Sequence, residues 1–157
     1  MMQRKPSILS PDLVFLNWGC STPDELFAQL EGPLAAGGYI ADGWCAAIAE
    51  RERAYPTGIS MPAASIAVPH IDPAYVRKPY IAIVKPADAV VFRPMAGMGE
   101  LVPARLVVNV GLTAGDSQVA LLQELMDIFT DASAADEVLS QSTPEGMVRA
   151  FAGYLDR

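Results

Sequence analysis

The chain has 157 residues, of which 52% are hydrophobic and 18% charged, and its formal net charge is −7. This composition excludes an intrinsically disordered chain, which combines few hydrophobic residues with many charges. The acidic balance argues against nonspecific nucleic-acid binding and against charge-driven binding to an anionic membrane. No apolar run reaches the roughly 18 residues of a membrane span, and the N-terminus does not read as a secretory signal. We therefore expect a cytoplasmic protein with a single domain over residues 1–157.

The N-terminal third predicts a strand followed by two helices. Residues 11–18 (PDLVFLNW) have the composition of a strand. Thr22 is the expected N-cap of the first helix, because Glu25 stands three residues later in a capping-box pattern. Asp42 is the expected N-cap of the second helix, which should end near residues 55–56 because a residue before proline avoids the helical region.

The rest of the chain predicts short strands and then helices. Strands are expected over residues 65–68, 80–84, 89–92 and 104–112, the last being the clearest. Helices are expected from an N-cap at Asp116 through Phe129, over residues 134–139 and over residues 144–155. Strands mixed with helices in this way predict an α+β fold in three layers.

The chain has one histidine, His70, which follows an expected strand and lies between Pro69 and Pro73. The prolines restrict the backbone on both sides of the imidazole. A metal site is weakly indicated, because Cys20 and Cys45 are distant and show no ligand spacing; reduced thiols are expected there, with a disulfide as the alternative. A hydrolase with a histidine base is also considered, but the sequence lacks the GxSxG motif that carries the nucleophile in many hydrolases. His70 can also be a nucleophile that accepts a phosphoryl group. The alternative to any of these roles is an ordinary, partly exposed histidine without a chemical function.

Phosphoryl transfer needs donors that meet the charge on the phosphoryl oxygens. Arg51, Arg53 and Thr57 lie near the end of the second predicted helix and can supply them. The alternative for the arginines is solvation or pairing with the terminal carbonyls of the helix. No Walker motif is present, so a nucleotide is not the evident phosphoryl donor.

Residues 51–59 (RERAYPTGI), followed by residues 65–70 (SIAVPH), resemble the active-site signature of the enzyme IIA proteins of the fructose–mannitol class. These proteins belong to the bacterial phosphoenolpyruvate-dependent sugar phosphotransferase system. Their pattern is an R-E pair, then P-T-G, a small-residue loop, and V-P-H. Residues 91–97 (VFRPMAG) are most similar to the galactitol-type branch. The resemblance covers roughly residues 42–129.

The resemblance implies a three-layer α/β/α sandwich around a mixed sheet and a phosphotransferase that needs no cofactor or metal. His70 matches the histidine that the family phosphorylates on its tele nitrogen. Arg51 matches the arginine that stabilises charge at the phosphorylation site, and Thr57 matches a threonine that can donate a hydrogen bond. The implied phosphoryl donor is the histidine-containing phosphocarrier protein, and the acceptor is a IIB component, usually at a cysteine. The sugar, galactitol in this branch, is bound by the membrane IIC component. A regulatory module switched by phosphorylation of His70 is the alternative.

One departure from the family pattern concerns a second histidine. Mannitol-type members carry it on the loop that corresponds here to residues 113–117 (TAGDS), which contains none. Its role is then absent, or is taken by Ser117 or water.

Apolar side chains near His70 are expected either to form the rim of a docking face or to pack in the core. They are Met61, Ile71, Tyr75, Met95 and Met98.

Overall fold

The computed structural model describes residues 8–61, 64–95, 97–113 and 118–155. Its centre is a five-stranded sheet with the strand order β1-β4-β7-β3-β2. The strands are β1 (Val14–Trp18), β2 (Gly58–Ser60), β3 (Ser65–Ala67), β4 (Tyr80–Pro86) and β7 (Leu106–Gly111). The β1–β4 and β3–β7 pairs are parallel, whereas β4–β7 and β2–β3 are antiparallel. The sheet is therefore mixed, as expected.

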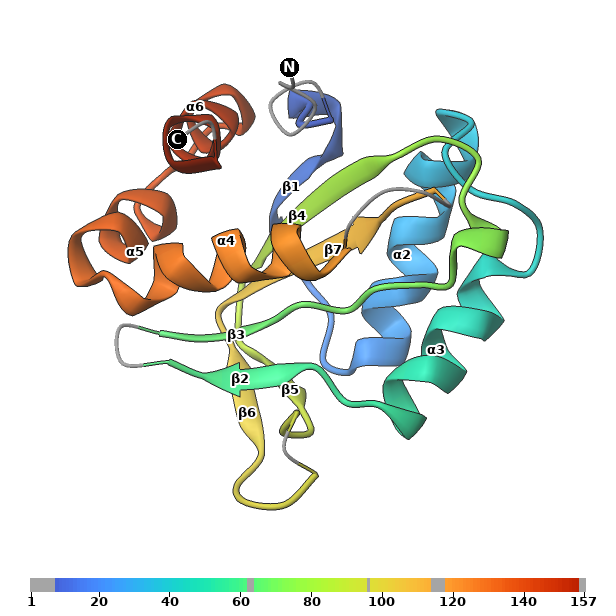
Figure 1. The fold of residues 1–157 in the computed structure, drawn as a ribbon, viewed down its shortest axis with the longest axis horizontal. Coiled ribbons are helices and arrows are strands. Elements are labelled where there is room, and N and C mark those ends of the chain that lie inside the picture. Colours follow the sequence, from blue (N-terminus) through green and yellow to red (C-terminus); the bar gives the residue numbers. More distant parts are fainter. Residues whose placement is uncertain (1–7, 62–63, 96, 114–117, 156–157) are drawn as a thin grey trace.

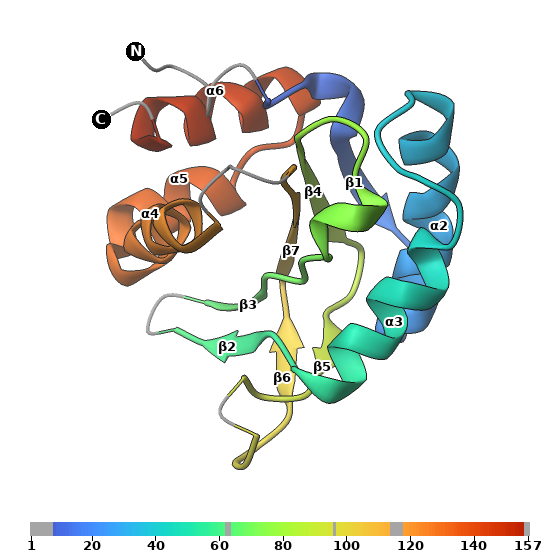
Figure 2. The same ribbon diagram turned by 45° about the vertical axis from the view of Figure 1, so that its right-hand side comes forward.

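Helices cover both faces of this sheet (Figure 1 and Figure 2). One face carries α2 (Pro23–Ala36) and α3 (Trp44–Ala54). The other carries α4 (Gln118–Thr130), α5 (Ala132–Leu139) and α6 (Pro144–Leu155). This arrangement confirms the three-layer α/β/α sandwich. Within the described part of the chain, no helix has both the length and the apolar character needed to cross a membrane.

The hydrophobic interior is divided by the sheet into two cores. We call them the α2–α3 core and the α4–α6 core, after the helices that cover them. Because side chains alternate along a strand, Val107 of β7 faces the α2–α3 core and Val108 faces the α4–α6 core. Asn109, the next residue, is fully buried and shares the face of Val107.

The N-terminal cap of α2 is the one that the sequence predicts. The amide of Glu25 donates to Thr22 Oγ1 at 3.2 Å, and Glu25 Oε1 accepts the amide of Ser21 at 2.8 Å. The prediction for α3 is wrong, because Gly43 and not Asp42 is the N-cap and it makes no side-chain cap. Gly43 has φ of 90°, a left-handed conformation that costs glycine little and other residues more.

The strand expected over residues 104–112 is in fact two strands. β6 (Val102–Ala104) pairs with β5 (Val90–Phe92) in a separate two-stranded sheet, and β7 begins only after Arg105. The amide of Arg105 donates to the carbonyl of Ser65 at 2.9 Å, so the chain changes partners at this residue.

The β5–β6 hairpin is attached to the main sheet at Gly58, the first residue of β2. The amide of Gly58 donates to the carbonyl of Arg93 at 3.1 Å, and its carbonyl accepts the amide of Met95 at 2.8 Å. A Cβ atom on Gly58 would lie 2.7 Å from the Arg93 carbonyl oxygen. Glycine therefore permits this close approach. The expected cap at Asp116 lies outside the described residues.

Candidate active site

His70 lies just beyond the end of β3 and is held beside β7. Its backbone forms an isolated parallel bridge with Val110. The amide of Val110 donates to the carbonyl of Pro69 at 3.1 Å. The His70 side chain is only half-buried. The local fold thus fixes the backbone beside the imidazole and leaves part of the ring open to solvent.

The hydrogen bonding of His70 defines the tautomer of its ring. Nδ1 lies 2.9 Å from the carbonyl oxygen of Val68. A carbonyl oxygen can only accept, so Nδ1 must carry the proton. In the neutral ring the lone pair is then on Nε2, the tele nitrogen.

The environment of His70 favours the neutral ring. Burial lowers the pKa of His70 below its usual 6.5, and the positive charge of Arg51 lowers this pKa further. The hydrogen bond to the Val68 carbonyl acts in the opposite direction, because it favours the protonated ring. The net shift is downward, so the imidazole is uncharged and nucleophilic at neutral pH.

Arg51 is brought to His70 by the last turn of α3. After burial, the positive charge of Arg51 is the second cause that lowers the pKa of His70. The guanidinium carbon lies 5.5 Å from the centroid of the Tyr55 ring, within the range of a cation–π contact. Tyr55 is 67% exposed, so this contact lies at the surface. A cation–π contact brings no anion to the guanidinium, so Arg51 keeps its positive charge.

Thr57 is buried, and both of its donors are used by Glu52. The Thr57 amide donates to Glu52 Oε2 at 2.7 Å, and its hydroxyl donates to Glu52 Oε1 at 2.9 Å. A threonine hydroxyl has only one hydrogen to donate. The donor role expected for Thr57 toward a phosphoryl group would therefore require this bond to open. In the structure Thr57 fastens the turn between α3 and β2.

Glu52, the acid of the R-E pair, is buried, and the sequence assigns no role to it. Its side chain is 8% exposed. Burial raises the pKa of Glu52 to about 7, although the two hydrogen bonds from Thr57 and the charges of Arg93 and Arg51 favour the ionised form. The signal that could have found it is helical spacing, since Trp44, Ile48 and Glu52 are the buried residues of α3, each four apart.

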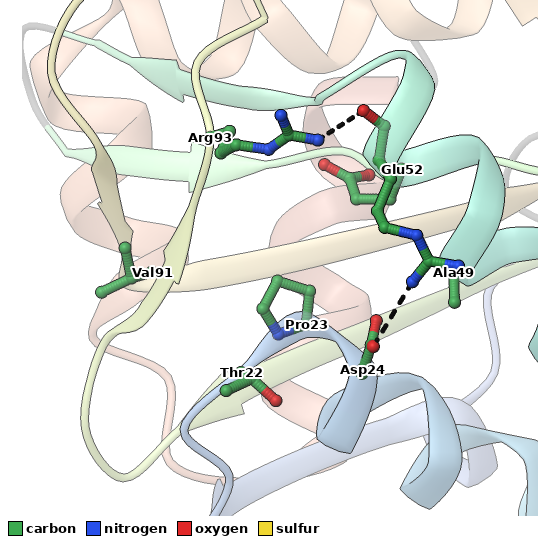
Figure 3. A pocket seen from close by; sticks show the side chains of 8 residues that line it. Thr22, Pro23, Asp24, Ala49, Glu52, Val91 and Arg93 are labelled. Atoms are coloured by element: carbon green, nitrogen blue, oxygen red, sulfur yellow. Dashed lines mark hydrogen bonds and ion pairs between the residues drawn. The ribbon is translucent and has the colours of Figure 1, made fainter.

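Glu52 also lines a cavity of about 240 Å³. Figure 3 shows that the N-terminus of α2, the end of α3 and the β5–β6 hairpin meet there. Arg53 pairs with Asp24 across 3.5 Å, and the guanidinium of Arg93 donates to the carbonyl of Arg53. His70 does not line this cavity. Of the two arginines at the end of α3, Arg51 acts on His70 and Arg53 faces α2.

The apolar residues expected near His70 separate into different environments. Ile71 is 2% exposed and belongs to the α2–α3 core, so it cannot form part of a rim. Met61 and Tyr75 are half-buried against the two cores. Met95 and Met98 are exposed, but they lie on the β5–β6 hairpin. The expected substitute for the second histidine, Ser117, lies outside the described residues.

The described residues contain no group of three His, Cys, Asp or Glu side chains that could hold a metal ion. Cys20 and Cys45 are free thiols. What the site offers is a neutral imidazole with its tele nitrogen unprotonated, a nearby guanidinium, and a rigid backbone. This set of groups can accept a phosphoryl group directly on nitrogen.

Comparisons with known proteins identify the family of this chain. The model of the family described as "Phosphoenolpyruvate-dependent sugar phosphotransferase system, EIIA 2" matches residues 7–153. The galactitol-specific EIIA component of Escherichia coli K12 is 29% identical over 82 residues, which are 51% of this chain and 55% of that protein. The chain thus spans about half the length of the curated relatives it matches.

Solved structures with the same fold include proteins of two kinds. The mannitol enzyme IIA of Escherichia coli, in complex with phosphorylated mannitol enzyme IIB, has a TM-score of 0.73 at 22% identity and covers 92% of this chain and 97% of that chain. The nitrogen regulatory protein IIA-Ntr of Neisseria meningitidis has a TM-score of 0.70 at 17% identity and covers 95% of this chain and 99% of that one. At these identities the likeness concerns the fold.

Proposed function

The chain belongs to the EIIA 2 family of the phosphoenolpyruvate-dependent sugar phosphotransferase system, and from that premise we propose that it is a cytoplasmic phosphocarrier that uses His70. The observation that carries the proposal is the bond between His70 Nδ1 and the Val68 carbonyl, 2.9 Å long. This bond leaves Nε2 as the nitrogen with an available lone pair. We further propose that residues 1–157 act as one unit in this role.

In the proposed first step, Nε2 of His70 attacks the phosphorus of a phosphohistidine on the histidine-containing phosphocarrier protein. The new P–N bond forms as the old one breaks, and the electron pair of the old bond returns to the donor's ring. Nδ1 keeps its proton throughout. The Val68 carbonyl, which accepts that proton's hydrogen bond, stabilises the positive charge that develops on the attacking ring.

Arg51 supplies the positive charge that the phosphoryl oxygens require. Its guanidinium is near enough to lower the pKa of His70, and it is attached to the end of a helix that Glu52 and Thr57 hold in place. Loss of one oriented donor of this kind typically costs about 100-fold in rate. We therefore assign Arg51 to charge stabilisation and Thr57 to fastening the turn that follows it.

In the proposed second step, the phosphoryl group passes to a cysteine of a IIB component, which serves sugar uptake through a membrane IIC component. The cysteine attacks phosphorus as its thiolate, so that a P–S bond forms while the P–N bond breaks and the electron pair of that bond returns to Nε2 of His70. The match to a galactitol-specific EIIA component supports galactitol as the sugar. The fold shared with an enzyme IIA solved in complex with its phosphorylated IIB partner supports the acceptor.

The experiment is a reconstituted phosphorelay with phosphoenolpyruvate, enzyme I and the phosphocarrier protein. Wild-type protein should acquire one acid-labile phosphoryl group, and the His70→Ala variant none. Arg51→Ala should slow transfer at least about 10-fold. Arg53→Ala is the matched control, because it removes a guanidinium two residues away that is paired with Asp24. An unlabelled wild type, or full labelling of His70→Ala, would refute the proposal.

A regulatory module with the same phosphorylation chemistry is the second candidate, favoured by the fold shared with a nitrogen regulatory IIA protein. The same phosphorylated sample separates the two. Mixing it with IIB proteins of the galactitol and mannitol types should discharge His70 if the chain serves transport. Persistent phosphohistidine in the presence of every IIB protein would favour the regulatory role.

A further inference from the structure

A chain of buried hydrogen bonds runs from α3 through β4 and β7 to the backbone beside His70. Trp44 Nε1 donates to the Tyr80 hydroxyl at 3.1 Å, and this hydroxyl donates to Asn109 Oδ1 at 2.9 Å. Asn109 Nδ2 then donates to the carbonyl of Pro69 at 3.0 Å. Trp44, Tyr80 and Asn109 are all fully buried. The last acceptor belongs to the residue immediately before His70.

The donor and acceptor groups at the two ends fix the direction of this series of hydrogen bonds. The indole of Trp44 can only donate, and the carbonyl of Pro69 can only accept. The Tyr80 hydroxyl accepts from the indole and must therefore give its single hydrogen to Asn109. Burial raises the pKa of Tyr80, so the hydroxyl keeps that hydrogen. The amide of Asn109 is thus held with its oxygen toward Tyr80 and its nitrogen toward Pro69.

The backbone makes room for this arrangement at Gly111. In the register of β4 and β7, Tyr80 is paired with Gly111 and Ala82 with Asn109. A Cβ atom on Gly111 would overlap the Tyr80 ring. The absence of a side chain at Gly111 lets the ring cross β7 and bring its hydroxyl to Asn109. Ala82, with its small side chain, lies opposite Asn109 in this register.

The carbonyl of Pro69 is held by two donors, Asn109 Nδ2 and the amide of Val110. Together they fix the plane of the peptide group that joins Pro69 to His70. The bond from His70 Nδ1 to the Val68 carbonyl spans this peptide group. A rotation of the group would therefore break the bond that sets the tautomer of the imidazole.

We propose that Asn109, oriented by Tyr80 and Trp44, is a positioning residue that keeps His70 in the Nδ1-protonated tautomer with Nε2 available for phosphoryl transfer. Its meaning for catalysis rests on the function proposed above. Asn109 reaches the backbone and not the phosphoryl group, so it acts through His70. A buried amide costs stability unless it is bonded, and here its bonds end at the peptide group beside the nucleophile.

The test uses the fact that His70 is the only histidine of the chain. In protein labelled with ¹⁵N-histidine, the two ring nitrogens give one pair of signals, which reports the tautomer without any phosphorylation. The wild type should show Nδ1 protonated. Asn109→Leu removes the amide while keeping a similar volume, and it should lower the share of this tautomer and slow phosphoryl transfer about 10- to 100-fold.

Tyr80→Phe is the second variant, because it keeps the ring and removes only the hydroxyl that orients Asn109. It should change the tautomer and the rate in the same direction by a smaller factor, and it decides the matter if Asn109→Leu does not fold. Val108→Ala is the matched control. Val108 is fully buried at the adjacent position of β7 but faces the α4–α6 core. This variant should lose stability without changing the tautomer.

The proposal is overturned if folded Asn109→Leu and Tyr80→Phe give the nitrogen signals of the wild type, or if Val108→Ala shifts them equally. Failure of the proposed function looks different. In that case the wild type takes no phosphoryl group, whereas the tautomer still responds to Asn109→Leu and Tyr80→Phe.

Discussion

Replacing Glu52 with glutamine should change how the stability of the protein depends on pH. In the structure Glu52 is 8% exposed and accepts two hydrogen bonds from Thr57. Glutamine can keep both contacts, because its oxygen can accept the Thr57 amide while its nitrogen donates to the hydroxyl, which rotates to accept. A protonated glutamic acid would bond in the same way. Glu52→Gln therefore mimics the protonated state at every pH.

The size of the effect follows from the pKa of Glu52. Burial raises this pKa from 4.5 to about 7. Between these values the folded state holds more protons than the unfolded state, so the free energy of unfolding falls as pH rises. A difference of about 2.5 pKa units corresponds to about 3 to 4 kcal/mol at about 1.4 kcal/mol per unit. The wild type should lose up to this amount by about pH 8, and Glu52→Gln should not.

The assay is urea unfolding of both proteins at a series of pH values from 4.5 to 8. The useful quantity is the difference in unfolding free energy between variant and wild type, because the titration of His70 and of surface groups is common to both and cancels. This difference should rise by about 3 to 4 kcal/mol in favour of Glu52→Gln across the range. Parallel stability curves would show that Glu52 has the same pKa in the folded and the unfolded protein, and would refute the reasoning.

Two further predictions concern Gly111 and His70. Gly111→Ala should reduce the unfolding free energy by at least about 2 kcal/mol in urea denaturation, because the added Cβ would overlap the Tyr80 ring. The control is Gly153→Ala, which has open space around its Cβ and should be neutral or stabilising by up to about 1 kcal/mol. Equal effects would contradict the packing argument. The pKa of His70, measured by NMR titration, should lie below 6.5 and should rise in Arg51→Gln, because the guanidinium charge lowers it. This His70 shift removes stability as pH falls below 6.5, and an unchanged pKa in Arg51→Gln would place the arginine away from the ring.

Elements specified by their own residues are predictable from the sequence. Thr22 caps α2 because its side chain and that of Glu25 are local partners. α6 is predicted over the bounds that it has, since its apolar spacing is clear and Pro144 suits a first turn. Asp42 misleads because aspartate is a good cap in general, whereas the chain here needs the left-handed conformation that Gly43 provides.

Elements that depend on distant partners are not predictable in this way. The break at Arg105 comes from a change of pairing partner, and nothing in the local pattern of residues 104–112 marks it. β2 has three residues, too few for a pattern, and is a strand because β3 and the β5–β6 hairpin bond to it.

The candidate site divides along the same line. His70 and Arg51 stand out from the sequence, because their motifs are contiguous and chemically distinctive. Glu52 lies in the same motif as Arg51, but the motif does not reveal that its carboxylate is buried against Thr57. Asn109 has no motif, since an amide in a strand acquires its role only from neighbours elsewhere in the chain. The bond from Asn109 to the Pro69 carbonyl spans 40 positions. A contiguous motif can thus be recognised in one sequence, whereas a hydrogen bond between distant residues becomes visible only in the folded protein.

The division of the interior by the sheet has a consequence for how substitutions on its two sides combine. The side chains that orient the backbone beside His70, those of Trp44, Tyr80 and Asn109, lie on the α2–α3 side of the sheet, whereas α4, α5 and α6 pack on the opposite side. Substitutions on the two sides share few neighbours, so their energetic costs should largely add without coupling. Substitutions in the buried faces of α4, α5 and α6 should therefore change the stability of the protein more than they change the hydrogen bonds that Trp44, Tyr80 and Asn109 make.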